Sequence, residues 1–226
     1  MKNQQADLEW RDDEIPVSLR FDDPYFSLGN GLEETRHVFL GGNDLPARFC
    51  EGFQIAELGF GTGLNLCAAL LSWREAGRTT PLRFTSFEAY PMTAAEMERA
   101  LRAFPEALRV APPILAQFAD GKTTIDLPDL HAEIIIGDAR ETLPKWPHKA
   151  DAWFLDGFSP AKNPELWEAN LMSAVADHTH PNGTFATYTA AGFVRKGLAE
   201  GGFAVERVKG YARKRHMSIG RLDTLT

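Results

Sequence analysis

The chain has 226 residues, a formal charge of -7 and 44% hydrophobic residues, which suits one folded domain and excludes a disordered chain. Its opening, from Met1 to Arg11, is polar and charged, and no run approaches the roughly 18 apolar residues of a membrane span. We therefore expect a cytoplasmic protein without a signal peptide or membrane partner. Cys50 and Cys67 form no C-x-x-C pair, so we expect reduced thiols.

The charge is distributed unevenly along the chain. Residues 1–189 hold 16 Lys and Arg against 28 Asp and Glu, a balance of -12, whereas residues 190–226 hold 8 against 3, a balance of +5. The overall charge disfavours a nucleic-acid partner, but a polyanion would be attracted to the C-terminal segment. A solvated helix and strand end would give the same composition, so charge alone leaves both interpretations open.

Strand and helix signals alternate after an irregular start. The first 50 residues are rich in Asp, Gly, Pro and Phe, which predicts an arm or short β elements, residues 1–50, packed on a domain of residues 51–226. The expected strands are 53–58, 82–87, 123–127, 133–136, 150–155, 184–188, 203–208 and 216–221; the expected helices are 64–74, one opening at a Thr93–Glu96 capping box, one at Asn163-Pro164, and 191–200. This alternation predicts an α/β fold with a doubly wound, mainly parallel sheet of the Rossmann-like type.

A glycine-rich turn follows the first strand of the domain. Glu57 precedes Gly59, Gly61 and Gly63, and glycines at alternate positions let the backbone pass closely beneath a ligand. This spacing differs from the G-x-G-x-x-G fingerprint of dinucleotide-binding proteins. An acid before the glycines also suits a cationic ligand, such as the amino group of a methionine moiety, better than a pyrophosphate. A structural turn remains the alternative.

Acids also end the later strands. Glu88 could accept hydrogen bonds from both ribose hydroxyls of a nucleotide, although this does not distinguish a nicotinamide dinucleotide from S-adenosylmethionine. Asp138, next to Ala139, could accept a hydrogen bond from an adenine amine. Together with Glu57, these acids predict a pocket for an adenosine with a cationic tail.

The strand 150–155 ends in Asp156, and Phe158 follows two residues later. An amine that accepts a methyl group must present its lone pair, so a carboxylate that takes its proton would orient and activate it. We therefore expect Asp156 to be catalytic. Phe158 could hold the amine or its neighbouring base by stacking, or it could instead close the hydrophobic core.

Several long segments resemble a known family, the methyltransferase domain of the bifunctional tRNA 5-methylaminomethyluridine biosynthesis proteins. The resemblance covers nearly the whole chain from about residue 16. The segments that carry it are 21–23, 25–27, 30–36, 38–43, 59–65, 151–158, 160–164, 191–198 and 213–215.

The resemblance implies a class I methyltransferase that uses S-adenosylmethionine to methylate the amine of 5-aminomethyluridine, often 2-thiolated, at the tRNA wobble position. It implies that Asp156 deprotonates or orients the amine and that the segment from Asn30 to Glu34 reaches over the cofactor. The residues expected to bind S-adenosylmethionine are Asn30, Glu34, Glu57, Gly59, Gly61, Gly63, Asn65, Glu88, Asp138, Ala139 and Asp156.

The basic residues of the C-terminal segment are expected to contact the tRNA backbone. They are Arg195, Lys196, Arg213, Lys214 and Arg215. The bifunctional proteins continue into a flavin-dependent domain, whereas this chain ends at Thr226. We expect either a natural single-domain enzyme, its aminomethyl substrate supplied by a separate flavoprotein, or a fragment of a longer protein. His178 and His180 lack a nearby acid cluster, so no metal is expected.

Three alternatives stay open. A methyltransferase for a small-molecule or protein amine would share the pocket but would not need the basic segment. A nicotinamide-dependent oxidoreductase would share the fold, although the glycine spacing argues against it. A tRNA-binding module without catalysis would not require the full set of acids.

Overall fold

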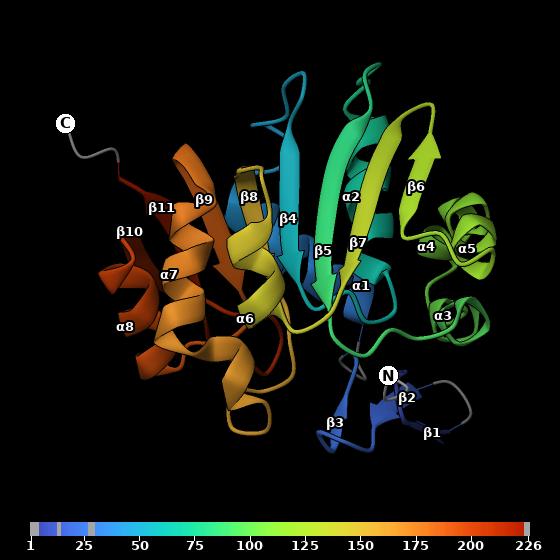
Figure 1. Ribbon diagram of the computed structural model, residues 1–226, viewed down its shortest axis with the longest axis horizontal. Coiled ribbons are helices and arrows are strands. Elements are labelled where there is room, and N and C mark those ends of the chain that lie inside the picture. The colour runs from blue at the N-terminus through green and yellow to red at the C-terminus, as the bar shows by residue number, and fades with distance from the viewer. Residues whose placement is uncertain (1–4, 13–14, 27–29, 224–226) are drawn as a thin grey trace.

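The computed structural model describes residues 5–12, 15–26 and 30–223. Most of these residues belong to one large β-sheet or to the helices that pack on it (Figure 1). In spatial order its strands are β10 (Phe203–Lys209), β11 (His216–Leu222), β9 (Thr179–Thr187), β8 (Ala150–Leu155), β4 (Gln54–Leu58), β5 (Leu82–Glu88), β7 (Leu130–Ile136) and β6 (Thr124–Leu127).

The strand order reverses at the centre of this sheet. The chain runs outward from β4 through β5 to β7, then returns to lay β8 on the other side of β4 and continues to β9. These strands are parallel, while β6, β11 and β10 pair antiparallel with their neighbours. The doubly wound, mainly parallel sheet predicted from the sequence is therefore confirmed. The reversal between β4 and β8 is the point at which such sheets bind ligands.

Helices cover both faces of the sheet. The α-helices are α1 (Gly31–Thr35), α2 (Leu64–Glu75), α3 (Ala94–Leu101), α4 (Pro105–Val110), α5 (Pro112–Ala119), α6 (Ala139–Thr142), α7 (Ala169–Asp177) and α8 (Gly192–Glu200). No helix in the described part of the chain is long and apolar enough to span a membrane.

The central strand β8 shows how the sheet divides two hydrophobic cores. Phe154 packs into the core that also contains Leu66 of α2, whereas Trp153 and Leu155 pack into the core that contains Leu198 of α8. Successive side chains of a strand point to opposite faces, so an almost wholly apolar strand is required between two covered faces. This explains why the run 150–155 was recognisable in the sequence.

The element boundaries follow local signals closely. The capping box is formed: Thr93 accepts from the Glu96 backbone, and the Glu96 carboxylate accepts from the Thr93 backbone. The expected strands 123–127 and 133–136 correspond to β6 and β7, which pair antiparallel. One expectation was wrong. Asn163-Pro164 opens a 3-10 turn, Pro164–Trp167, without a side-chain cap, and α7 begins only at Ala169.

The N-terminal region contains more structure than its composition indicated. Leu8–Arg11 (β1), Ile15–Ser18 (β2) and Asp23–Pro24 (β3) form the expected short β elements, as a separate three-stranded sheet. The helical run that follows was not expected: α1 continues into a π-helical turn, Arg36–Leu40, and a 3-10 turn, Gly41–Asn43. Its buried side chains share the core of the large sheet, so tertiary packing stabilises a run whose sequence lacks periodicity. Ser27, part of the segment 25–27, lies outside the described residues.

A buried polar network fastens this helical run to the large sheet. The Asn43 amide donates to the carbonyl oxygens of Phe39 (2.9 Å) and Trp153 (3.2 Å) and accepts from the Thr184 hydroxyl (2.6 Å). The Arg48 guanidinium donates to the backbone of Asn43 and to the Thr184 hydroxyl. Each of these groups would be costly to bury without a partner.

We predict that Asn43→Leu lowers the free energy of unfolding by about 2–4 kcal/mol, because it leaves several buried polar groups unsatisfied. Urea denaturation followed by circular dichroism measures this change. Asn170→Leu, at an exposed position of α7, is the matched control and should change stability little. Equal stability of the two variants would contradict the role of Asn43.

Candidate active site

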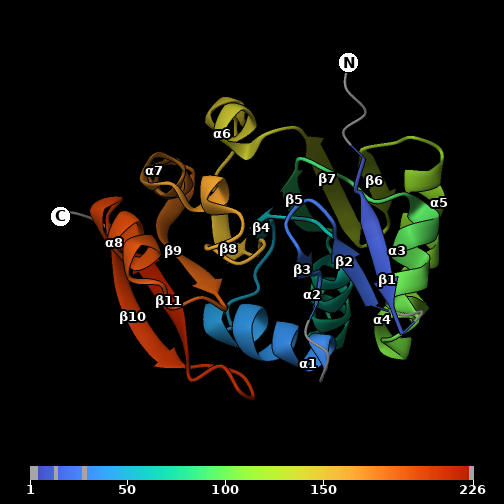
Figure 2. The same ribbon diagram turned by 90° about the horizontal axis from the view of Figure 1, so that it is seen from below.

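A cavity of about 860 Å³ opens at the carboxyl ends of β4, β5, β7 and β8. The small sheet and α1 lie at this edge of the large sheet, as Figure 2 shows from below. The volume falls in the range of roughly 300–1,000 Å³ that is typical of small-molecule sites. Of the expected cofactor-binding residues, those that line it are Glu34, Gly59, Gly61, Asn65, Glu88, Asp138, Ala139 and Asp156.

The glycine-rich turn passes close to the end of β8. Gly59 has φ +90°, and a Cβ at this position would lie 1.9 Å from the carbonyl oxygen of Asp156. Gly61 has φ +53° and donates its backbone N–H to Glu88. Any larger residue at position 59 would therefore push apart the two strand ends that form the cavity floor. Gly63 precedes α2 and lies behind the cavity wall.

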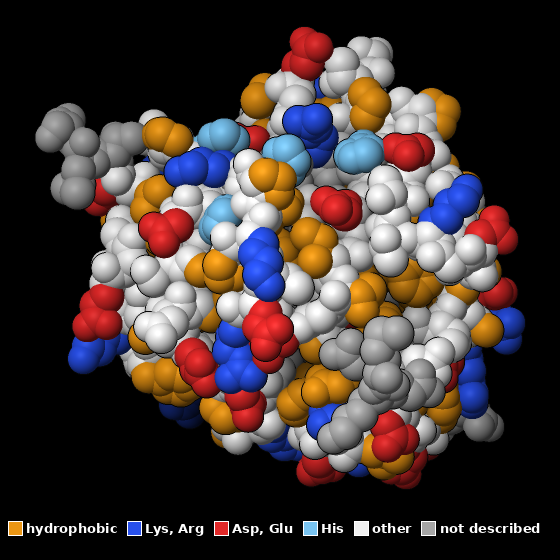
Figure 3. Space-filling view, viewed as in Figure 1, with side chains coloured by type: hydrophobic (Ala, Val, Ile, Leu, Met, Phe, Trp, Pro, Cys, Tyr) orange, Lys and Arg blue, Asp and Glu red, His pale blue; other side chains and the backbone are white. Residues whose placement is uncertain are grey.

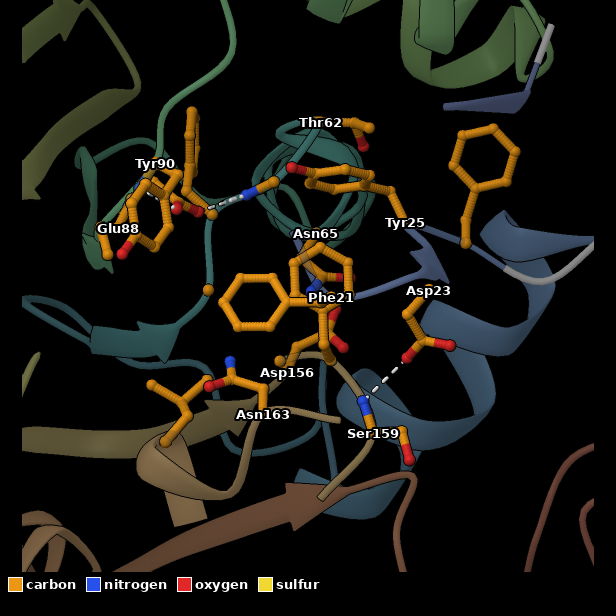
Figure 4. A pocket seen from close by; sticks show the side chains of 18 of the residues that line it. Phe21, Asp23, Tyr25, Thr62, Asn65, Glu88, Tyr90, Asp156, Ser159 and Asn163 are labelled. Carbon is orange, nitrogen blue, oxygen red and sulfur yellow. Dashed lines mark hydrogen bonds between the residues drawn. The ribbon is translucent and has the colours of Figure 1, made fainter. Parts of the chain in front are cut away.

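Glu88 is fixed at one side of the cavity by two backbone donors. Its Oε2 accepts from the N–H of Gly61 (2.9 Å), and its Oε1 accepts from the N–H of Tyr90 (2.8 Å). Figure 4 shows Glu88 and Tyr90 together at one side of the pocket. A carboxylate oxygen can accept further hydrogen bonds, so both oxygens can still receive ligand hydroxyls.

Asp138 caps the short helix α6. Its carboxylate accepts from the backbone and the guanidinium of Arg140, with a shortest distance of 2.7 Å. These hydrogen bonds hold the pKa of Asp138 below its usual value, so the group stays charged. Asp138 can therefore serve only as a hydrogen-bond acceptor for a ligand in the cavity.

Asn65 joins three polar side chains beneath the cavity. Its Nδ2 donates to Glu57 (2.9 Å) and to Asp156 (2.7 Å), and its Oδ1 accepts from the hydroxyl of Thr35 (2.8 Å). Glu57 is fully buried behind Asn65, where it also accepts from Ser86. Burial raises the pKa of Glu57. Glu57 is thus positioned to support Asn65 rather than to line the cavity.

Asp156 lies half-buried at the end of β8, directly on the cavity floor. Burial raises the pKa of its carboxyl group to about 7, while the Asn65 hydrogen bond and the charge of Lys214 oppose the rise. An acid with a pKa near 7 can take up a proton at neutral pH more readily than an ordinary aspartate can. The geometry therefore allows Asp156 to act as a proton acceptor.

Phe158 belongs to an aromatic group at the cavity wall, not to either hydrophobic core. Its ring stacks on Phe21 at 4.8 Å between centroids and meets Tyr25 edge to face at 4.9 Å. Tyr90 extends this group through an edge contact with Phe21. Phe21, Tyr25 and Tyr90 were not expected at the site from the sequence, although the first two lie in segments that carry the family resemblance.

A hydrogen bond and ion pairs join the small sheet to the loop after β8, on the other side of the cavity. The Asp23 carboxylate accepts from the backbone N–H of Ser159 (2.9 Å), a bond drawn in Figure 4. Lys162 forms ion pairs with Asp23, at the start of β3, and with the preceding Asp22. These contacts join β3 to the loop that follows Asp156, so the aromatic group is held in place from both sides.

The basic residues of the C-terminal segment divide into two groups. Arg213 and Arg215 are exposed in the loop between β10 and β11, and Lys196 is exposed on α8, where it pairs with Glu200. Lys214 instead lines the cavity and forms an ion pair with Glu34 (2.7 Å). Arg195 is half-buried and donates to the carbonyl oxygen of Ala190. Asn30 caps α1 by accepting from the backbone of Glu33.

The residues present fit S-adenosylmethionine. Glycines bring the backbone to the cavity, Glu88 keeps acceptor capacity for ribose hydroxyls, and Asp138 stays charged beside Ala139. Six acids and four Lys or Arg residues line the cavity, a balance that suits a ligand with positive charge. Among the described residues, no group of three or more His, Cys, Asp or Glu could hold a metal ion.

Two curated relatives resemble the chain over almost its whole length. Both are named tRNA 5-methylaminomethyl-2-thiouridine biosynthesis bifunctional protein MnmC. The protein from Stutzerimonas stutzeri is 44% identical over 99% of this chain and 36% of its own length. The one from Aeromonas hydrophila is 44% identical over 95% of this chain and 35% of its own length. The chain thus spans about a third of these relatives.

Solved structures and a family model agree with the fold. The crystal structure of MnmC2 from Aquifex aeolicus has a TM-score of 0.77 and 25% identity, covering 97% of this chain and 73% of that one. The S-adenosylmethionine-bound structure of CalS10, an amino pentose methyltransferase from Micromonospora echinaspora, shares the fold at a TM-score of 0.50 and 12% identity, covering 86% of this chain and 92% of that one. Residues 106–223 match the model of a family described as S-adenosyl-L-methionine-dependent methyltransferase, and the chain belongs to that family.

Proposed function

We propose that the chain methylates the amine of 5-aminomethyluridine or its 2-thio form at the wobble position of tRNA. The observation that carries this proposal is the half-buried Asp156 carboxylate, which lies at the end of β8 in the cavity that Phe158 also lines. The name of the MnmC relatives, which match over nearly the whole chain, supports the choice of substrate.

The cofactor residues follow from the strand ends that form the cavity. We propose that Glu88 holds the ribose, Asp138 and Ala139 the adenine, and the backbone of Gly59 and Gly61 the methionine moiety. S-adenosylmethionine supplies a methyl group on a positively charged sulfur, which becomes a neutral thioether once the methyl group leaves. Glu57 and Asn65 would act from below, by keeping the floor of the cavity in shape.

Asp156 would manage the proton of the acceptor amine. A protonated amine has no free lone pair, so its proton must leave before the nitrogen can be methylated. The Asn65 amide holds one Asp156 oxygen at 2.7 Å and so orients the carboxylate. Phe158, with Phe21 and Tyr25 around it, would hold the pyrimidine ring by stacking and exclude water from the amine.

Basic residues of the C-terminal segment would hold the tRNA backbone. On the face shown in Figure 3, basic and acidic side chains are interspersed, so a polyanion meets mixed charge there. Arg213 and Arg215 are exposed in the loop after β10, and Arg195 and Lys196 lie on α8. All four belong to the positively charged segment 190–226. We assign the phosphate contacts to these four residues.

A tRNA substrate would place the reaction in the cytoplasm. The aminomethyl group must be produced before it can be methylated, and we propose that a flavoprotein activity, in a separate protein or a further domain, supplies it. The alternative acceptor, a small-molecule or protein amine, would use the same cavity without the basic residues, so the experiments below distinguish the two.

We predict that Asp156→Ala lowers methyl transfer to tRNA bearing 5-aminomethyluridine by about 10²–10⁴-fold, the usual contribution of a general base. Labelled S-adenosylmethionine and mass spectrometry of the digested nucleosides measure the product. Calorimetric binding of S-adenosylmethionine should change little. Lost cofactor affinity with normal turnover would contradict the role of Asp156, and absence of transfer by the unmodified enzyme would contradict the tRNA substrate.

We also predict that Asp156→Asn stabilises the protein at high pH. The folded protein holds the Asp156 proton with a pKa of about 7, above the ordinary 3.8, so the native state loses stability as pH rises through 7. The amide side chain of the variant stays neutral at every pH, so it never places a charge at this partly buried position. Asp156→Asn should therefore raise the free energy of unfolding by about 1–2 kcal/mol at pH 8 and by little at pH 4. Urea melts at the two pH values test this, and an equal effect at both would exclude the raised pKa.

The tRNA contacts are tested by salt dependence. Arg213→Ala should weaken tRNA binding and reduce the slope of log Kd against log salt concentration by about 1, because one phosphate contact is lost. Filter binding over a range of salt concentrations measures the slope. Arg78→Ala, exposed after α2 at the opposite edge of the sheet, is the control and should leave it unchanged. Equal slopes for both variants would remove Arg213 from the interface.

A further inference from the structure

Lys214 behaves differently from its basic neighbours. Arg213, Lys214 and Arg215 are all exposed, but Lys214 also lines the cavity, where its ammonium lies 2.7 Å from a carboxylate oxygen of Glu34. The side chain of Glu34 is only 11% exposed, against 43% for Lys214. This ion pair joins the loop between β10 and β11 to α1, at the cavity wall.

An aromatic ring completes the surroundings of this ammonium. The Lys214 nitrogen lies 4.2 Å from the centre of the Tyr188 ring, a distance at which the ring face attracts a cation. The Tyr188 hydroxyl donates to the carbonyl oxygen of Gly157 (2.7 Å), directly after Asp156. Burial raises the pKa of Tyr188, so the ring stays neutral and the hydroxyl stays a donor. The ring is therefore held in a fixed place.

The same ammonium lies within electrostatic reach of the proposed proton acceptor. The charge of Lys214 lowers the pKa of Asp156, and the charge of Glu34 raises it. These three side chains and that of Tyr188 line one cavity. A primary ammonium ion is thus held by a carboxylate and an aromatic face, beside the carboxylate that would accept an amine proton.

The end of a lysine side chain is chemically the same group as a protonated aminomethyl substituent. Both are a CH₂ group that bears a primary ammonium, with three hydrogen-bond donors and one positive charge. A site that binds the first has the charge and the aromatic surface to bind the second.

We propose that Glu34 and Tyr188 form the subsite for the ammonium group of the acceptor, which Lys214 fills until the acceptor arrives. The proposal rests on the proposed function in that it takes a primary amine as the acceptor. It assigns Glu34 to the acceptor rather than to the cofactor. The acceptor ammonium would enter next to Asp156, and Lys214 would turn outward to the side of Arg213 and Arg215, where phosphate groups of a polyanion would bind.

Exchange of one ammonium for another also provides specificity. A neutral substituent, such as a hydroxymethyl group, would displace Lys214 without supplying a positive charge to Glu34. Glu34, a largely buried carboxylate, would then lose the ammonium group that faces it, which is unfavourable. The subsite therefore selects an aminomethyl group over a hydroxymethyl group of almost the same size.

The test compares two nucleosides, 5-aminomethyluridine and 5-hydroxymethyluridine, neither of which carries a phosphate. Their Kd values are measured by competition calorimetry on the protein loaded with S-adenosylhomocysteine, so that no transfer occurs. The native chain should prefer the amine. Glu34→Gln should weaken amine binding roughly tenfold and leave binding of the alcohol nearly unchanged, because only a charged partner is lost.

Lys214→Met should have the opposite effect. Removing the resident ammonium while keeping a long apolar stem should tighten binding of the amine roughly three- to tenfold, because Lys214 no longer competes for the subsite. Lys149→Met is the matched control, since this exposed lysine precedes β8 at the opposite edge of the sheet. It should change neither Kd. Thermal melts and binding of S-adenosylhomocysteine check that each variant is folded.

Opposite changes in the Kd of the amine for Glu34→Gln and Lys214→Met distinguish the subsite from a structural ion pair. If the ion pair were only structural, both variants would change this Kd in the same direction. The subsite is excluded if both variants weaken amine binding, or if the native chain discriminates between the nucleosides no better than Glu34→Gln does. Absence of methyl transfer to tRNA with an intact, Glu34-dependent preference for the amine would contradict the proposed function and leave the subsite supported.

Discussion

The arrangement of the cavity depends on one side-chain amide. An asparagine amide has two N–H donors, and Asn65 directs one to each of two carboxylates, Glu57 and Asp156. These donors lower the pKa of both acids and so oppose the burial that raises it. The carbonyl oxygen of the same amide accepts from Thr35, so the first turns of the helical run, the start of α2 and the end of β8 meet at a single residue. The site therefore requires an asparagine side chain at position 65, in the first turn of α2.

This requirement also explains why an N-terminal region of low regularity is part of the site. The Thr35 hydrogen bond holds α1 against the cavity, and the neighbouring Glu34 is thereby placed at its wall. On the other side, the Asp23 carboxylate and the stack of Phe21 on Phe158 hold the small sheet over the loop after β8. The large sheet supplies the strand ends, and the N-terminal region closes the space between them and solvent.

The features that could be predicted from the sequence are those that depend on local chemistry and on the topology of the sheet. The strand 150–155, the capping box at Thr93 and the meeting of Gly59, Glu88 and Asp156 at one edge were recognisable, since parallel strands bring their carboxyl ends together. The direction of a side chain was not recognisable. Glu57 is buried behind Asn65 and Lys214 lines the cavity, because neighbouring elements, not residue type, decide where each side chain finds a partner. The helical run before Asn43 escaped prediction for a related reason, as its stability comes from packing against the sheet.

On the proposed function, the charge of Asp156 is coupled to what the cavity contains. Burial raises the pKa of this acid to about 7, and the positive charge of Lys214 opposes this effect. Each cation that enters the cavity stabilises the charged form of the acid and lowers its pKa further. A positively charged cofactor would therefore help to deprotonate Asp156 before the acceptor binds, whereas exchange of Lys214 for a substrate ammonium would leave the local charge unchanged. The Asp156 carboxylate would then be charged and able to accept a proton when both ligands are bound. A neutral acceptor that displaced Lys214 would instead remove a positive charge from beside Asp156.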